Sequence, residues 1–497
     1  MVKSIQHFEE VSTGVFETII RKFVDNPKDF ASFTYGITEE LHALGRTIIE
    51  ETLEELDGMI CKSGKRKHDW IIEQRPKKQL VTTLGTVRFR KTFFTNKHTG
   101  ETACLLDRIL GLEKHERIAE DAHARILEEA VQTSYRRGGE EASMTTDEVS
   151  KQAVMKKLHA LRFPQGWEIP KEKKAVDYLY IEADEDHIAL QYRDTKGDLI
   201  RTGKGQKNNG AITKLIYVHE GVEPEAPKSK RHRLIRPFYF CRTAGGCPND
   251  ELWDSVYRYM DDNYDLTKVR KIYMSSDGGG WIKSGMRRIS GIVHVLDRFH
   301  LEKHLTKLIS HMGDSSDDAR RELYRILYKG TKAQFLELCG ELKGYYPEAA
   351  GTEGFDESLN YILDNWTAAK LRLRKMEGIV GSSTEGHVSH VLASRMSTQA
   401  MGWSLKGADK MAQLRAYYLN GGDMLRLVRY QKQELPKAAG NEYRSCLSSY
   451  DIIKREKNPR NEAKKHEERK YEEAMSHSVK LNTKKRIRFE KWLWGLL

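Results

Sequence analysis

The stretch KVRKIYMSSDGGGWIKSGMRRISGIVHVLDRFHLEKH, residues 268–304, contains two apolar runs that each end near a carboxylate. Residues 269–274 and 292–296 have the length and character of buried strands, and Asp277 and Asp297 follow them. Strand, acidic loop, short helix, strand, acid and helix form an α/β pattern, in which ligand groups gather at strand ends. Asp277 alone is explained equally well as a turn residue, because Asp-Gly is a common turn dipeptide.

Composition predicts a soluble protein of several domains. The 497 residues are 39% hydrophobic and 31% charged, which suits two or three domains with their own cores. The net charge of +12 favours an anionic partner, most commonly nucleic acid. There is no apolar run of membrane-spanning length and no signal-peptide pattern, so we expect a cytoplasmic protein without a membrane partner. The six scattered cysteines predict free thiols.

Two regions precede the α/β part. Residues 1–78 form an N-terminal helical region, whose apolar positions serve a core or a dimer contact. Residues 79–165 combine a β-hairpin, expected at residues 79–96 with Gly85 in its middle, and a helix-turn-helix with a glycine-containing break. The candidates for contacting DNA bases are on its last helix: Ser150, Lys151, Gln152, Lys156 and Lys157. The hairpin carries Arg88, Arg90 and Lys91, which could contact phosphates or line a solvated edge. The helix-turn-helix pattern also occurs in helical hairpins that do not bind DNA.

Residues 171–312 predict the first part of an α/β core. Residues 176–183 resemble a strand that ends at Asp184, and runs at 188–192 and 212–218 complete an antiparallel meander, followed by a helix at 250–262. Three strands, a helix, a strand and further α/β elements are the order of a ribonuclease-H-like domain, in which Asp184 and Asp277 lie at the ends of neighbouring strands. Carboxylates so placed can share divalent ions, and an all-oxygen site suits Mg²⁺.

The remaining segments predict an insertion, a final helix and a basic tail. Residues 313–378 read as an all-α insertion, and residues 379–403 return with Glu385 at the start of a helix, where capping alone would also favour an acid. Residues 404–497 are helical and then highly basic, which suits either phosphate contact or a solvated tail.

Four motifs together resemble a known family. Asp184 in YIEADEDH, Asp277 in SSDGGGWIKSG, the DRFH box at residues 297–300, and Glu385 in SSTEGHVSHVLASRM are similar to the DDE transposases of bacterial insertion sequences, with the ISLre-two family of the Mutator-like superfamily as the nearest match. The resemblance implies a ribonuclease-H-like catalytic core interrupted by an all-α insertion and preceded by a mainly helical DNA-binding region with a small β-hairpin.

The resemblance also implies an activity and its partners. Asp184, Asp277 and Glu385 would hold Mg²⁺, for which Mn²⁺ can substitute, and His300 and Asp297 would belong to the catalytic site. The partners would be the terminal inverted repeats of the element and target DNA, and the protein would act as at least a dimer on DNA, associated with the bacterial nucleoid. His300 would orient a phosphate or a carboxylate, or be purely structural.

Three alternatives stay open. Trp366 in the insertion is either a buried aromatic of a helical bundle or, above the metal site, a stacking platform for an unpaired base. His300 with His304, and His387 with His390, suggest a transition-metal hydrolase, although Leu301 stands where a zincin helix needs Glu. The third alternative is a transposase-derived DNA-binding protein without transposition activity.

Overall fold

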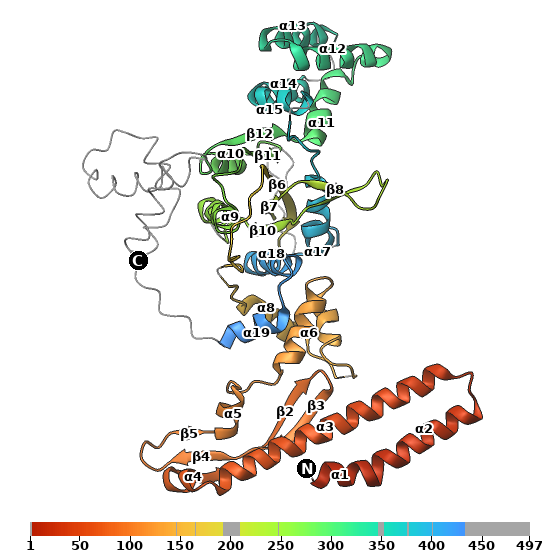
Figure 1. The fold of residues 1–497 in the computed structure, drawn as a ribbon, viewed down its shortest axis with the longest axis vertical. Coiled ribbons are helices and arrows are strands. Elements are labelled where there is room, and N and C mark those ends of the chain that lie inside the picture. The colour runs from red at the N-terminus through yellow and green to blue at the C-terminus, as the bar shows by residue number, and fades with distance from the viewer. Residues whose placement is uncertain are drawn as a thin grey trace. The chain divides into compact units, whose positions relative to one another are not determined.

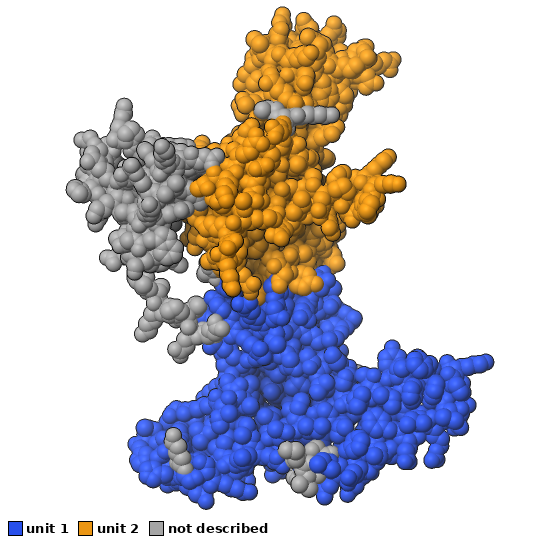
Figure 2. Space-filling model, in the orientation of Figure 1, with its two compact units in different colours: residues 1–164, 422–434 blue, residues 165–421, 435–497 orange. Residues whose placement is uncertain are grey.

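The computed structural model of the protein describes residues 2–145, 147–164, 166–191, 209–246, 248–345, 352–374, 377–399 and 401–432. The chain divides into two compact units, residues 1–164 with 422–434 and residues 165–421 with 435–497 (Figure 2). The basic tail expected to contact phosphate lies outside the described residues.

Unit 1 begins with helices that fold back on each other. The elements are α1 (Val2–His7), η1 (Phe8–Ser12), α2 (Thr13–Asp25), α3 (Phe30–Lys62) and α4 (Gly64–Asp69). Asp29 accepts a hydrogen bond from the Ser32 amide and so caps the N-terminus of α3. The C-terminal half of α3 packs Ile49, Leu53, Leu56 and Ile60 against the core of the hairpin that follows.

The predicted hairpin is shorter than expected. It consists of β2 (Lys77–Thr82) and β3 (Gly85–Arg90), with Gly85 at a φ of 109° beside the turn. Residues 93–96 belong instead to β4 (Phe93–Asn96) of a separate sheet with β1 (Trp70–Gln74) and β5 (Thr102–Ala103). Lys91 is buried and forms an ion pair with Asp107, so its expected contact with phosphate is wrong, whereas Arg88 and Arg90 are exposed.

The rest of unit 1 is a helical cluster of α5 (Leu105–Leu110), α6 (Glu120–Ala130), α7 (Tyr135–Glu140), α8 (Lys151–Ala160) and α19 (Met424–Lys432). The predicted glycine break is wrong, because Gly138 and Gly139 lie inside α7. A Cβ at Gly138 would crowd Ala130, and one at Gly139 would overlap the Val149 carbonyl, so both glycines allow close packing. Residues 141–150 separate α7 from α8, which is a longer connection than the three or four residues of a helix-turn-helix.

Unit 2 is built on a mixed five-stranded sheet. Its strands are β6 (Tyr178–Ala189), β7 (Gly210–His219), β10 (Phe238–Thr243), β11 (Lys271–Ser276) and β12 (Ile292–Leu296). The order is β10-β7-β6-β11-β12, with the pairs β10–β7 and β7–β6 antiparallel and the pairs β6–β11 and β11–β12 parallel (Figure 1). A two-stranded ribbon of β8 (Val222–Pro224) and β9 (His232–Leu234) lies outside this sheet.

The first strand of this sheet corrects the predicted meander. The run expected at 176–183 and the start of the run expected at 188–192 belong to one strand, β6, so Asp184 does not end a strand, and the third strand of the meander is β10. β7 is long enough to pair with β6 as far as Ala189↔Gly210, whereas the pairing of β6 with β11 stops at Ala183↔Ser276. Asp184 therefore lies where the parallel neighbour ends.

The two faces of the sheet are covered by different segments, because side chains alternate along each strand. Leu179, Ile181 and Ala183 share a core with α9 (Asn249–Asn263) and with Ile282 of α10 (Gly280–Met286). Tyr180, Tyr273 and Val295 point to the other face, where Ile379 and Val380 pack. Figure 1 shows α9 and α10 on one side of the sheet and α17 on the other.

The face of the sheet opposite α9 is covered by the helices that follow a helical insertion. The returning elements are α16 (Thr384–His387), η3 (Val388–Ala393), α17 (Ser394–Met396) and α18 (Leu405–Leu419). The helices between β12 and that return are α11 (Arg298–Ile309), η2 (Gly313–Ser315), α12 (Ser316–Lys329), α13 (Lys332–Gly344), α14 (Glu353–Asp364) and α15 (Trp366–Leu373). They bury their own core, which includes Leu323, Phe335, Phe355 and Ile362.

Candidate functional site

Three aspartates lie at one edge of the sheet because of the strand register. Ala183 of β6 pairs with Ser276 of β11, and Ser276 pairs with Leu296 of β12. The residues that follow these three are Asp184, which lies within β6 where its pairing with β11 stops, and Asp277 and Asp297, which come directly after β11 and β12. They point to the face opposite α9 by the alternation of side chains. The parallel register therefore gathers acids that are far apart in sequence.

Asp184 is the most buried of the proposed triad, and its surroundings oppose its negative charge. Its side chain accepts a hydrogen bond from the Glu185 amide at 2.8 Å. Burial raises the pKa of Asp184 to about 7; the Glu185 amide and His300 oppose this shift, while the charges of Asp277 and Glu385 add to it. The effect of these charges shows that the three predicted acids lie close enough to interact.

The turn that carries Asp277 is held from two sides. Gly279 donates its amide to Oδ1 of Asp277 at 2.8 Å, and Gly278 has a φ of 80°, which only glycine adopts readily. From α14, the Tyr361 hydroxyl donates to the Asp277 carbonyl oxygen at 2.6 Å. A Cβ at Gly278 would collide with Asn365, so the helical insertion fits closely over this turn. The sequence did not identify Tyr361, since it resembled any half-buried aromatic in a helix.

Glu385 is exposed at the start of α16, and a buried carboxylate anchors the loop before it. Glu182 of β6 accepts hydrogen bonds at Oε2 from four donors: the Tyr217 hydroxyl at 2.7 Å, the Ser383 amide at 3.0 Å, the Thr384 hydroxyl at 2.5 Å and the Ser382 hydroxyl at 3.2 Å. Its Oε1 lies 3.3 Å from Nε2 of His219. Burial opposes the charge of Glu182, but these partners outweigh it and lower its pKa.

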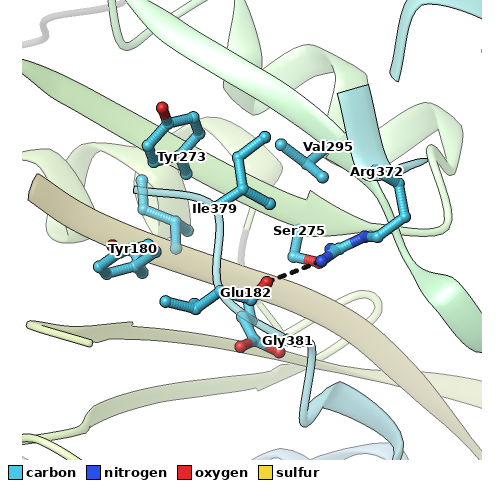
Figure 3. Close-up of a pocket in the computed structure, with 10 residues that line it drawn as sticks. Tyr180, Glu182, Tyr273, Ser275, Val295, Arg372, Ile379 and Gly381 are labelled. Carbon is cyan, nitrogen blue, oxygen red and sulfur yellow. Dashed lines mark hydrogen bonds between the residues drawn. The ribbon is translucent and has the colours of Figure 1, made fainter. Parts of the chain in front are cut away.

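Arg372 of α15 joins the same loop to the parallel strands. It donates Nε to the Leu296 carbonyl at 2.7 Å, Nη1 to the Val380 carbonyl at 2.7 Å and Nη2 to the Ser275 hydroxyl at 2.6 Å. Figure 3 shows Arg372 beside Ser275 in a small pocket that Tyr180, Tyr273 and Ile379 also line. The guanidinium therefore ties the last helix of the insertion to the segment that leads to Glu385.

Asp297 and His300 form a pair at the start of α11. Asp297 caps the helix by accepting the His300 amide, and its Oδ2 lies 3.2 Å from Nδ1 of His300. Burial disfavours the charge of Asp297, yet the hydrogen bonds from His300 and Ser382 lower its pKa to about 2. The hydrogen bond to Asp297 is the main reason that the pKa of His300 is raised, despite burial. Asp297 is thus engaged by His300, and the raised pKa favours the protonated form of His300 beside the acids.

Two of the other histidines that suggested a transition metal, His304 and His387, have partners in the packing. Nδ1 of His304 lies 3.1 Å from the Ser358 hydroxyl, and its ring stacks on Tyr361 at 3.9 Å. Nδ1 of His387 lies 3.1 Å from the Ser383 carbonyl oxygen, and its ring stacks on Tyr217 at 4.7 Å. These contacts favour structural roles and count against a zinc hydrolase.

The donor set fits a hard divalent cation. Asp184, Asp277 and Glu385 offer carboxylate oxygens, which Mg²⁺ and Mn²⁺ accept, and their mutual repulsion is what a cation relieves. Across the part of the chain that the structure describes, His68, Asp69 and His98 of unit 1 are the one group with three donor atoms within 4.8 Å of one another. At least two of the three carboxylates of the triad are therefore more than 4.8 Å apart.

Of the residues predicted to contact DNA on the last helix of the helix-turn-helix, two have partners within the protein and the other three are exposed. On α8, Ser150 accepts the Ala153 amide as a helix cap and Lys157 lies 3.7 Å from Glu116, while Lys151, Gln152 and Lys156 are exposed. Asp186, two residues after Asp184 in β6, accepts a hydrogen bond from Ser397.

Trp366 is half-buried and packs its ring edge-on against Phe335 at 5.3 Å, with Lys370 over its face. This packing favours the interpretation of Trp366 as a core aromatic of the insertion. Among the described helices, none combines the length and the apolar content needed to cross a bilayer.

Comparisons with known proteins add a family without a described activity. The family described as "Uncharacterised protein family (UPF0236)" matches residues 24–434. Curated relatives come from Caldanaerobacter subterraneus subsp. tengcongensis: one UPF0236 protein is 33% identical over 87% of this chain and 86% of its own, and another is 34% identical over 86% of each chain. The printed name of the first joins eleven loci, and that of a third relative, 32% identical over 87% of this chain and 86% of its own, joins four.

Proposed function

This chain belongs to the UPF0236 family, and we propose that it is the DNA transposase of a bacterial insertion sequence, which cleaves DNA at the element ends and joins the released strand to target DNA. The observation that carries the proposal is the parallel register of β6 and β11, which places Asp184 beside Asp277, with Glu385 close enough to raise the pKa of Asp184.

The strand order supports a ribonuclease-H-like core. Three antiparallel strands followed by two parallel strands, in the order β10-β7-β6-β11-β12, is the arrangement expected for that fold. The helical group between β12 and Glu385 corresponds to the insertion that the family resemblance implies. A ligand site at the carboxyl ends of parallel strands is also the general rule for α/β sheets.

The copies in one genome support a mobile element. A single name that joins eleven loci, beside another that joins four, means that this family has many paralogues in one organism. Multiplication of one gene within a genome is what transposition of that gene produces.

Asp184, Asp277 and Glu385 would hold Mg²⁺, with Mn²⁺ as a substitute, and the bound ions would supply activation of water or of a 3′-hydroxyl and neutralise charge on the phosphate. The chain's own residues position the reaction. Gly279 and Tyr361 fix the Asp277 turn, and Glu182 fixes the loop before Glu385. His300, held by Asp297 through Nδ1, has Nε2 available to bind a phosphate oxygen.

DNA recognition would require contacts outside the acids. Lys151, Gln152 and Lys156 on α8 and Arg88 and Arg90 on β3 are exposed in unit 1 and provide donors for phosphate and base edges. At least two copies would be needed to bring both ends of an element together.

The test uses the purified full chain and end-labelled duplexes taken from the DNA that flanks its gene, with scrambled duplexes as the comparison. With Mg²⁺ or Mn²⁺ we expect strand cleavage at a fixed position in the flanking DNA, a free 3′-hydroxyl and joined products with a target plasmid, none of which forms in EDTA. Specific binding to the flanking DNA without cleavage in either metal would instead identify a DNA-binding protein that has lost transposition.

A further inference from the structure

Helix α3 carries an apolar seam that nothing in the described part of the chain buries. Phe30, Ile37, Leu41, Leu44 and Ile48 are spaced 7, 4, 3 and 4 residues apart, which is the a/d pattern of a coiled coil, with Thr34 at the one remaining position. All five side chains are exposed or half-buried, and Phe30, Leu41 and Ile48 retain 60%, 53% and 45% of their surface.

The seam is distinct from the two faces of α3 that do have partners. One face packs Ile49, Leu53, Leu56 and Ile60 on the hairpin core. Another meets α2, where Ile19 lies against Gly36 and Phe23 stacks on Phe33 at 4.5 Å. Figure 1 shows α2 folded back along α3 as a hairpin. At 100° per residue the seam lies between these two faces. They touch it only at its borders: Phe23 of α2 also contacts Phe30 edge-on at 5.9 Å, and Leu84 of the hairpin turn lies beside Gly45.

The charge of the N-terminal helices disfavours nucleic acid and anionic lipid as partners of the seam. Residues 1–62 contain twelve Asp and Glu against six Lys and Arg, although the whole chain has a net charge of +12. Such a surface repels nucleic acid and anionic lipid. An apolar stripe in an acidic setting therefore fits a protein partner.

The flanks of the seam fit another helix of the same kind. Along one side the neighbouring residues Ala31 and Thr38 are small and uncharged, so a second helix can approach this part of the seam without repulsion between like charges, whereas Gly45 further along lies against Leu84 of the hairpin turn. The seam ends where Glu51 and Glu55 occupy its next two positions. Residues 30–48 give a contact about 28 Å long. We propose that this seam binds the same seam of a second copy, so that two α2–α3 hairpins associate as a four-helix bundle.

This association is independent of the proposed catalytic function, because it requires neither DNA nor a metal ion. It also supplies the dimer that a transposase needs to hold two DNA ends. A failure of cleavage would leave the dimer untouched, and a monomeric protein that still cleaves would refute the dimer alone.

The test is sedimentation equilibrium of the full chain in EDTA without DNA, over a range of concentrations. We expect a dimer for the wild type, and for Leu41→Lys and Ile48→Lys a rise in dissociation constant of about 30-fold or more, since buried hot-spot residues at interfaces each contribute at least about 2 kcal/mol. Tyr35→Lys is the matched control: Tyr35 is 72% exposed on the same helix but lies off the seam, and its variant should dimerise like the wild type.

A second measurement guards against variants that misfold. Ile37→Cys and Leu41→Cys, oxidised alone and as a mixture, should give a disulfide-linked dimer in at least one of the three samples, with the parent protein as control. A wild type that stays monomeric, or an absence of linked dimer in all three samples, would overturn the proposal.

Discussion

Replacing the buried carboxylate of Glu182 by an amide, Glu182→Gln, should reduce cleavage more than it reduces stability. Oε2 of Glu182 accepts four hydrogen bonds, three of them from the loop 382–384 that leads to Glu385. Hydrogen bonds to a charged group contribute about 1.5–3 kcal/mol each and neutral ones about 0.5–1.5 kcal/mol. Gln keeps one oxygen but loses the charge, so each bond weakens by about 1 kcal/mol, while the burial cost of the charge disappears.

The net expectation is a loss of about 1–3 kcal/mol in the free energy of unfolding of unit 2. The same weakening lets the Ser383–Thr384 turn move and misplaces Glu385. A displacement that costs about 1.4 kcal/mol at the transition state lowers the rate about 10-fold, and we expect at least that loss, together with a higher Mg²⁺ concentration for half-maximal rate.

The assay compares the cleavage rate of labelled end DNA against Mg²⁺ concentration, with thermal unfolding followed by circular dichroism. Glu223→Gln is the matched control, because Glu223 is on the outer ribbon and pairs only with exposed Arg233 among the contacts described for it. If Glu182→Gln unfolds at a lower temperature but keeps the wild-type cleavage rate and Mg²⁺ dependence, Glu182 stabilises the fold without positioning Glu385.

Three further outcomes follow from the site. Burial is the main reason that the pKa of Asp184 is raised to about 7, well above its ordinary value of 3.8, so the metal-free protein should lose stability as the pH rises from about 4 through 7. The variant Asp184→Asn should abolish that loss. Unfolding temperatures measured in EDTA at about pH 5 and about pH 8 check both expectations. Phe299→Ala should leave the unfolding temperature unchanged, since Phe299 is 51% exposed. If the Phe299 ring stacks on a base beside Asp297, the variant should cleave intact ends about 10-fold more slowly than the wild type. Equal cleavage rates for variant and wild type would exclude the stacking. Trp366→Ala should lower the unfolding temperature of unit 2, with a cost of about 3 kcal/mol, because Trp366 packs on Phe335, and should show the same cleavage defect on intact and mismatched ends.

Local patterns in the sequence predicted individual elements well where one face is buried. The strand predicted at residues 292–296 is β12, and the helix predicted at 250–262 is contained in α9. The break predicted after Ala183 was wrong, because Asp184, Glu185 and Asp186 suggest a turn by composition. Pairing with β7 keeps these residues extended, and a partner strand at residues 210–219 is not visible in the local pattern.

The acids of the site could be predicted, but their supports could not. Asp277 and Asp297 follow apolar runs, and that position is visible in the sequence. Glu182 looked like one more polar residue in an alternating strand, and its role appears only when residues 382–384, about two hundred positions later, fold over it. The same distance in sequence hides Tyr361, whose hydroxyl fixes the Asp277 turn from α14.

The most direct test of the account is the Mg²⁺-dependent cleavage of end DNA by Asp184→Asn, Asp277→Asn and Glu385→Gln, beside the control Asp317→Asn, which changes an exposed acid at the start of α12. We predict that each of the three triad variants binds end DNA like the wild type and cleaves at less than about one hundredth of its rate, a loss of at least about 2.7 kcal/mol in transition-state stabilisation, whereas the control cleaves normally. Cleavage near the wild-type rate by any one of the three would remove that residue from the site, and cleavage by all three would contradict the account.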